Sequence, residues 1–162
     1  MAIQTEALLH VALVTDQLER MEAFYQDVFG ARTLKRLDLD SERFAAGVGV
    51  PGATAVTVHL LVPGAEVVLE LTRYRAVQPA APGAPANAAG WRHIAFRVPD
   101  LAAAAKELAD RGVPVVGEGP VVVDRPAAAA GTGFLYLRDP DGNIVELIQP
   151  PAPAPTPEGD QA

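Results

Sequence analysis

The segment LLHVALVTDQLERMEAFYQDVFG at residues 8–30 is repeated in outline by WRHIAFRVPDLAAAAKELADRGV at residues 91–113, and this repeat decides the fold. In each copy a histidine, His10 or His93, opens a short apolar or alternating run that predicts a strand, over residues 10–14 and 93–98. An Asp then precedes a Leu and a segment with helical spacing. The chain therefore contains two modules that both begin with a strand and a helix.

Apolar spacing and capping residues place the two helices. The first is expected over about residues 17–28, with one apolar face and a glycine stop: Leu18, Met21, Phe24, Tyr25, Val28 and Gly30. The second is expected over about residues 101–111, with an Asp cap, an inward face and a glycine end: Asp100, Leu101, Ala104, Ala105, Leu108 and Gly112. Both helices are predicted to pack on a core.

Strand signals follow each helix. They cover residues 53–62 and 66–72 around a Pro63-Gly64 turn, and residues 134–138 and 143–149 around the DPDG turn at 139–142. One strand, one helix and three strands, given twice, predict an α+β fold of two paired βαβββ modules that form a curved antiparallel half-barrel. The expected divisions are a first module (1–75), a Pro/Ala-rich linker (76–90), a second module (91–149) and a disordered Pro-rich tail (150–162).

Composition limits the function. About half of the 162 residues (49%) are hydrophobic, which allows a real core, and the absence of cysteine excludes disulfides, thiolate metal sites and cysteine nucleophiles. A formal charge of -7 without a basic run argues against nucleic acid as a partner. The sequence shows neither a leader peptide nor an apolar run long enough for a membrane span, so we expect a cytoplasmic protein without a membrane partner.

Two glutamates interrupt apolar strands, Glu70 in VVLELT and Glu146 in NIVELI. An unpaired carboxylate is costly to bury, so each needs a partner. On the repeat His10 matches His93 and Glu70 matches Glu146, and pairing of the modules would bring two nitrogen and two oxygen donors together. This set suits a divalent ion such as Ni, Zn, Fe, Co or Mn, and positions left for water would make the site catalytic.

Simpler interpretations compete with this one. A lone histidine at a strand start is usually structural, and Glu70 is also compatible with a solvent-facing ion pair to Arg73 or Arg75. The repeat favours the interpretation as metal ligands.

His59 is the third histidine. A two-residue turn at Pro63-Gly64 would place it opposite Val68, on the same sheet face as Glu70. It is then a candidate for a contact in the site, although a packed or solvent-facing position is slightly favoured. Six aromatic residues are candidates for the wall of an apolar pocket, although most of them are expected to lie in the core: Phe44, Tyr74, Trp91, Phe96, Phe134 and Tyr136. Surface positions are the default for three arginines that are also candidates for binding an anionic group: Arg36, Arg43 and Arg73.

The chain resembles the vicinal-oxygen-chelate superfamily over residues 8–149, and within it bacterial glyoxalase I and its relatives. The carrying motifs are LLHVALVTDQLERMEAFYQDVFGA, EVVLELTRY, WRHIAFRVPDL and FLYLRDPDGNIVELI. The resemblance implies His10, Glu70, His93 and Glu146 as metal ligands, with Glu146 also as the proton-shuttling base. A glutamate at position 70 narrows the choice of activity within the superfamily. Extradiol dioxygenases and fosfomycin enzymes generally use two His and one Glu, and methylmalonyl-CoA epimerase has Gln at this position. The full set of two His and two Glu therefore favours glyoxalase-like isomerase or lyase chemistry.

The first functional hypothesis is a metal-dependent isomerase or lyase that moves a proton with Glu146 or Glu70 on a small oxygen-rich, enolisable substrate. The alternatives are a small-molecule binding or antibiotic-resistance protein and an iron-dependent dioxygenase of the same superfamily. The resemblance also implies a homodimer with modules exchanged between chains, although the linker permits pairing within one chain. The sequence selects neither the substrate nor the metal.

Overall fold

The computed structural model describes residues 3–76 and 83–151. Its contacts divide the chain into two compact units, Met1–Gly83 with Asp139–Gly142, and Ala84–Arg138 with Asn143–Ala162. Part of the predicted linker (77–82) and most of the predicted tail (152–162) lie outside the described residues. Within the described ranges, no helix combines the length and the apolar character that a membrane span requires.

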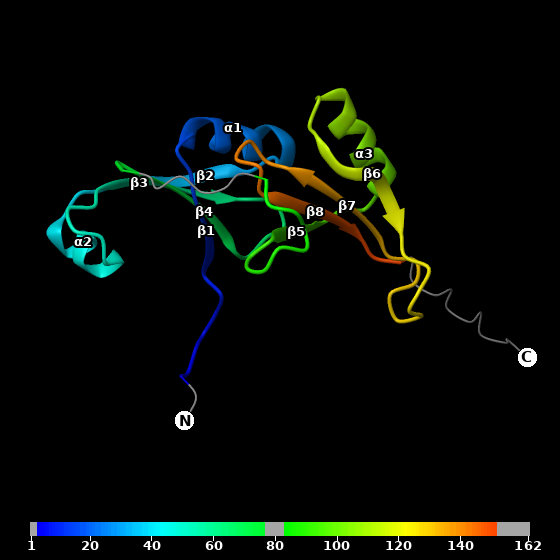
Figure 1. Ribbon diagram of the computed structural model, residues 1–162, viewed down its shortest axis with the longest axis horizontal. Coiled ribbons are helices and arrows are strands. Elements are labelled where there is room, and N and C mark those ends of the chain that lie inside the picture. Colours follow the sequence, from blue (N-terminus) through cyan, green and yellow to red (C-terminus); the bar gives the residue numbers. More distant parts are fainter. Residues whose placement is uncertain (1–2, 77–82, 152–162) are drawn as a thin grey trace, which may run out of the picture. The chain divides into compact units, whose positions relative to one another are not determined.

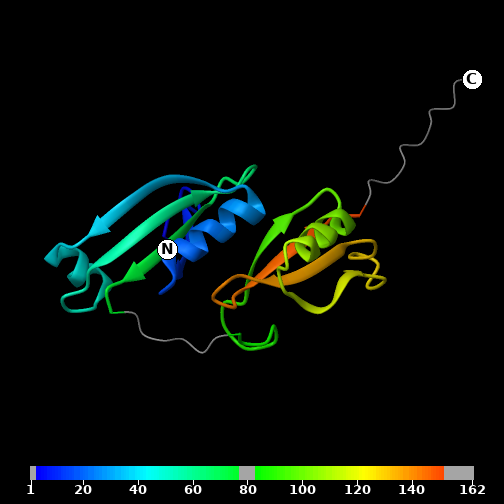
Figure 2. The same ribbon diagram turned by 90° about the horizontal axis from the view of Figure 1, so that it is seen from above.

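The first unit is a four-stranded sheet with one helix along one face and a second, short helix beyond the strand ends (Figures 1 and 2). Its elements are β1 (His10–Val14), α1 (Leu18–Phe29), β2 (Arg32–Leu39), α2 (Glu42–Val48), β3 (Ala55–Leu61) and β4 (Val68–Tyr74). The second unit repeats this plan without the short helix. Its elements are β5 (His93–Arg97), α3 (Leu101–Asp110), β6 (Val115–Val122), β7 (Gly133–Arg138) and β8 (Ile144–Gln149).

The two sheets have the same strand order, β1-β4-β3-β2 and β5-β8-β7-β6. This confirms the α+β class and the βαβββ pattern, but the sheets are mixed rather than wholly antiparallel. The pairs β1–β4 and β5–β8 are parallel, and the remaining pairs are antiparallel. In the first unit α1 returns the chain so that β2 runs in the direction of β1, and two antiparallel pairings then restore that direction in β4.

The helices lie close to their predicted ranges because the sequence caps them. Gly30 ends α1 with a φ of 64°, a left-handed conformation that glycine adopts without a steric penalty. At the start of α3 the Asp100 side chain accepts a hydrogen bond from the Ala103 backbone N–H at 2.9 Å. The buried face of α1 consists of Leu18, Met21 and Tyr25, and that of α3 of Leu101 and Leu108.

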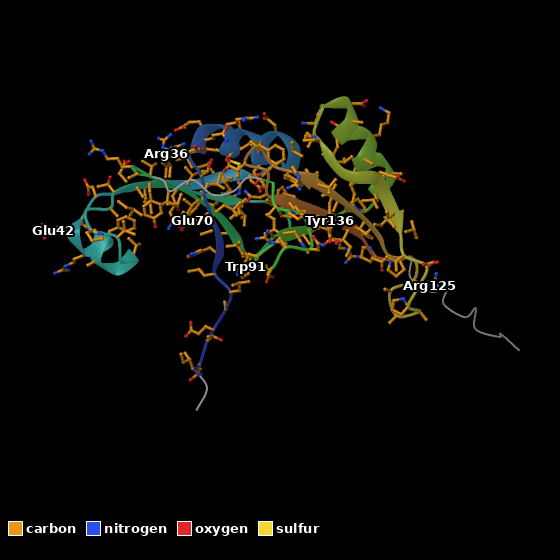
Figure 3. All side chains as sticks on the ribbon, in the orientation of Figure 1. Arg36, Glu42, Glu70, Trp91, Arg125 and Tyr136 are labelled. Atoms are coloured by element: carbon orange, nitrogen blue, oxygen red, sulfur yellow. The ribbon has the colours of Figure 1, made fainter. Side chains whose placement is uncertain are left out.

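Strand alternation separates a core face from an open face in each sheet. On the α1 side, β3 and β4 bury Val58, Leu60, Leu69 and Leu71. The residues between them, including His59 and Glu70, point to the opposite face, since successive strand side chains alternate. In Figure 3 Arg36 lies on the α1 side of this sheet and Glu70 on the other. The second sheet likewise buries Leu135, Leu137, Val145 and Leu147 against α3, and Tyr136 and Glu146 point away from that helix.

The DPDG turn forms as predicted, with the Gly142 N–H donating to the Asp139 carbonyl at 2.9 Å. Contacts assign this turn to the first unit. Asp139 is buried, and its carboxylate accepts hydrogen bonds from the Tyr25 hydroxyl at 3.2 Å and from the Asp141 N–H at 3.0 Å. Burial raises the pKa of Tyr25 well above its ordinary value, and the adjacent Asp139 adds to the rise, so the phenol stays protonated and donates.

Candidate metal centre

The first unit carries three of the candidate site residues on its open face. His10 is the first residue of β1, His59 lies in β3 and Glu70 is the third residue of β4. In the parallel β1–β4 pair His10 is opposite Val68 and Ala12 is opposite Glu70, so His10 and Glu70 are diagonal neighbours. The His10 and His59 rings lie with their centroids 6.3 Å apart.

His59 and Glu70 are direct partners. The sequence-based prediction that His59 pairs with Val68 is wrong: His59 is opposite Glu70. A two-residue turn at Pro63-Gly64 would have set the predicted register, but β4 begins only at Val68, and the longer connection moves the pairing by two positions. His59 Nε2 lies 2.9 Å from Glu70 Oε2.

The charge state of His59 follows from its surroundings. Its side chain is only 14% exposed. Burial lowers the pKa of His59 below its ordinary value, and the nearby Glu70 charge opposes this decrease without cancelling it. A neutral imidazole has one N–H, and the carboxylate can only accept, so Nε2 carries the hydrogen in this contact. Thr72 Oγ1 lies 3.1 Å from the other carboxylate oxygen, Glu70 Oε1, and 3.2 Å from Thr57 Oγ1.

In the second unit the predicted pair His93 and Glu146 is in contact. His93 Nε2 lies 3.3 Å from Glu146 Oε2, and the Glu146 side chain is 13% exposed. Tyr136 is directly opposite Glu146 in the β7–β8 pair, and its ring centroid is 5.4 Å from that of His93. Burial raises the pKa of Tyr136, and the negative charge of Glu146 contributes to the rise.

The two glutamates therefore occupy equivalent positions in different surroundings. His59 opposite Glu70 corresponds to Tyr136 opposite Glu146. In β3, Thr57 is two residues before His59, whereas in β7 the residue two before Tyr136 is Phe134, whose ring lies 5.5 Å from the Tyr136 ring. Glu70 thus lies among His59 and two threonines, and Glu146 lies between His93 and the ring of Tyr136.

The donor chemistry of these residues fits a divalent ion. Imidazole nitrogen and carboxylate oxygen together suit Zn, Ni, Co, Fe and Mn, and each unit brings one imidazole and one carboxylate of the predicted set to its open face. Across residues 3–76 and 83–151, no group of three or more His, Asp or Glu side chains lies together in a geometry that could hold an ion. The predicted donors are His10 and Glu70 in the first unit and His93 and Glu146 in the second.

Sequence reasoning undervalued two residues of the open faces, His59 and Tyr136. The slightly favoured interpretation of His59 was a packed or solvent-facing residue, and Tyr136 was assigned mainly to the core. The signal was present in the repeat, because both residues lie opposite the glutamate of their own unit. The missing information was the strand register of the first hairpin.

Among the arginines and aromatics weighed for substrate binding, Phe134 and Tyr136 lie on the face of Glu146, and the positions of several others are as follows. Arg36 and Arg73 form ion pairs with Glu19 and Glu22 of α1 on the core side of the sheet, which removes them from the open face. Phe44 of α2 stacks on Tyr74, with ring centroids 6.1 Å apart. Trp91 is 83% exposed and lines no core.

Two βαβββ units, each with a histidine and a glutamate on the open face of its sheet, define a class of proteins built by duplication of one module. A family model described as the Glyoxalase/Bleomycin resistance protein/Dioxygenase superfamily matches residues 7–147. The chain belongs to this superfamily, as its motifs predicted.

Relatives and solved structures agree with this membership. The chain is 34% identical to a lactoylglutathione lyase of Neisseria meningitidis over 143 residues, covering 88% of this chain and 89% of that protein. It is 31% identical to a 2-epi-5-epi-valiolone epimerase of Actinomyces over 152 residues, covering 92% and 82%. In fold it is similar to a glyoxalase family protein from Bacillus cereus, with a TM-score of 0.75 at 21% identity and coverage of 93% and 99%. These relatives at about 30% identity support an isomerase or lyase of the glyoxalase type.

Proposed function

We propose that the chain is a metal-dependent isomerase or lyase that moves a proton on a small, oxygen-rich, enolisable substrate. The observation that carries the proposal is the same placement of a histidine and a glutamate in both units: His10 with Glu70, and His93 with Glu146, on the two parallel neighbouring strands that begin and end each unit. The lyase and the epimerase among the relatives support the reaction type, since an epimerase must break and remake a bond at a stereocentre.

The proposed ligands are His10, Glu70, His93 and Glu146. We propose that the site is composite and uses both pairs, since each unit carries one histidine and one glutamate of the predicted set. A divalent ion bound there would act as a Lewis acid, which polarises a substrate oxygen and acidifies the adjacent C–H.

The protein groups then have separate roles. Glu146 takes the proton from carbon and returns it, as a general base and then a general acid. Tyr136 faces it across the β7–β8 pair, and the Phe134 ring lies 5.5 Å from the Tyr136 ring. Glu70, held by His59 and Thr72, acts mainly as a ligand and secondarily as a proton carrier.

The test of this function is turnover of adducts of methylglyoxal with several thiols, with and without a chelator. We expect isomerisation that a chelator abolishes and added Ni²⁺, Co²⁺ or Zn²⁺ restores. Chelator-insensitive turnover would contradict metal dependence. Oxygen consumption would instead indicate a dioxygenase, and binding of metabolites without turnover of any substrate would indicate a binding protein.

Assembly follows from the need to combine the two pairs of ligands. We propose a homodimer in which His10 and Glu70 of one chain share a site with His93 and Glu146 of the other. Sedimentation of the metal-loaded protein should give twice the mass of the 162-residue chain. A monomer with full metal content would show that both pairs of one chain form the site.

A further inference from the structure

The contact between His59 and Glu70 is more specific than a surface ion pair. Both side chains are largely shielded, 14% and 20% exposed, and the two residues face each other directly in the β3–β4 ladder. Strands on either side hold their backbones, because β3 also pairs with β2 and β4 also pairs with β1. The sheet therefore places the two side chains opposite each other, and Nε2 lies 2.9 Å from Oε2.

A second donor acts on the same carboxylate. Thr72 Oγ1 reaches Glu70 Oε1 at 3.1 Å, and Thr57 Oγ1 lies 3.2 Å from Thr72 Oγ1. Each oxygen of Glu70 thus has its own partner, and both partners stand on strands of one sheet. Since each carboxylate oxygen has two lone pairs, these contacts leave acceptor capacity for an ion.

The corresponding surroundings of Glu146 are different. The position of His59 is taken by Tyr136, and that of Thr57 by Phe134. The position of Thr72, two residues after the glutamate, is taken by Ile148. Hydrogen-bond donors with an N–H or hydroxyl on both carboxylate oxygens are thus a feature of the first unit's glutamate.

We infer that His59 is a positioning residue that holds Glu70 in the orientation in which it binds the metal, and so divides the roles of the two glutamates. This inference rests on the proposed function. A ligand carboxylate that is already held loses less conformational freedom on binding, and partners of this kind typically contribute about 10- to 100-fold to metal affinity. Glu70 is then a held ligand, while Glu146, whose Oε2 lies 3.3 Å from His93 Nε2 and which has Ile148 at the position of Thr72, keeps the proton-transfer role.

The experiment is titration of the metal-free full-length protein with Co²⁺, followed by its visible absorption, which reports affinity and ligand geometry without turnover. His59→Leu removes the donor and should weaken Co²⁺ binding about 10- to 100-fold with an unchanged absorption band. His59→Gln keeps an N–H donor and should recover most of the affinity. Lys35→Arg is the matched control, because Lys35 is opposite His59 on β2 and lies on the same face, and the substitution keeps its charge; it should bind Co²⁺ within about threefold of the parent.

The outcomes separate this inference from the proposed function. If the parent protein binds Co²⁺ and His59→Leu binds it equally or more tightly, the positioning role is wrong and the metal function stands. If His59→Leu and His59→Gln both abolish binding, His59 is itself a ligand and the inference is also wrong. If the parent does not bind, the proposed function fails first. Should His59→Leu not fold, as judged by thermal unfolding, Thr72→Val removes the second donor and should still weaken binding.

Discussion

Glu146→Gln is expected to lower turnover by about 100-fold or more while the fold and most of the metal affinity remain. The amide oxygen of glutamine can still coordinate an ion, but the amide cannot accept a proton from carbon. Glutamine also fills the same space opposite Tyr136 in the β7–β8 pair. The measurement is turnover together with metal content for the parent and the variant, on whichever substrate proves active.

Glu70→Gln is the matched comparison for this prediction. The same chemical change at the equivalent strand position should reduce turnover less, because Glu70 is held between His59 and Thr72 and acts mainly as a ligand. If Glu146→Gln turns over as fast as the parent, Glu146 is only a ligand. The proton-transfer mechanism would then have to be replaced by oxygenation or simple binding.

His93→Ala is expected to remove most of the bound metal, with a loss of affinity of more than about 100-fold. A missing ligand should cost more than the 10- to 100-fold typical of losing a partner of a ligand, since surrounding hydrogen bonds cannot replace a coordinating nitrogen. Because the His93 side chain is 38% exposed and begins β5, its removal should leave thermal unfolding nearly unchanged.

The control for His93→Ala is Trp91→Ala, two residues earlier. Trp91 is 83% exposed and belongs to no strand, so its loss should not alter the metal content. Equilibrium dialysis against Ni²⁺ or Zn²⁺ followed by elemental analysis measures both variants. Full metal content in His93→Ala, and likewise in His10→Ala and Glu146→Ala, would refute the assignment of ligands.

Elements with a clear apolar period were predictable from the sequence. The helices α1 and α3 and the strands β1 and β5 lie within one residue of their predicted ends, because the caps and glycine stops are local signals. The strand β2, Arg32–Leu39, was not located. Nearly all of its residues are exposed, so RTLKRLDL has no apolar alternation to recognise. The strand β6 was not located either. It contains Gly117, Gly119 and Pro120, and its register shifts between Val116 and Val121, so its sequence also lacks a recognisable strand pattern.

The sequence predicted which residues belong to the candidate site, but not which of their side chains are in contact. The repeat identified His10, Glu70, His93 and Glu146 as candidates, but which side chains touch within each sheet depends on register, and register depends on the length of the connection between strands. The prediction for the first hairpin was wrong by two positions, and this concealed the His59–Glu70 contact. The short helix α2 was also missed, although Ser41 caps it by accepting from the Phe44 N–H at 3.2 Å.

The central claim, that this chain holds a divalent ion through two histidines and two glutamates, is tested most directly by elemental analysis of the purified full-length protein after metal loading and removal of free ions. We expect about one divalent ion per chain, in a monomer or a dimer alike, because each proposed composite site uses one pair of ligands from each unit. A metal content no higher than that of a protein without such residues would contradict it.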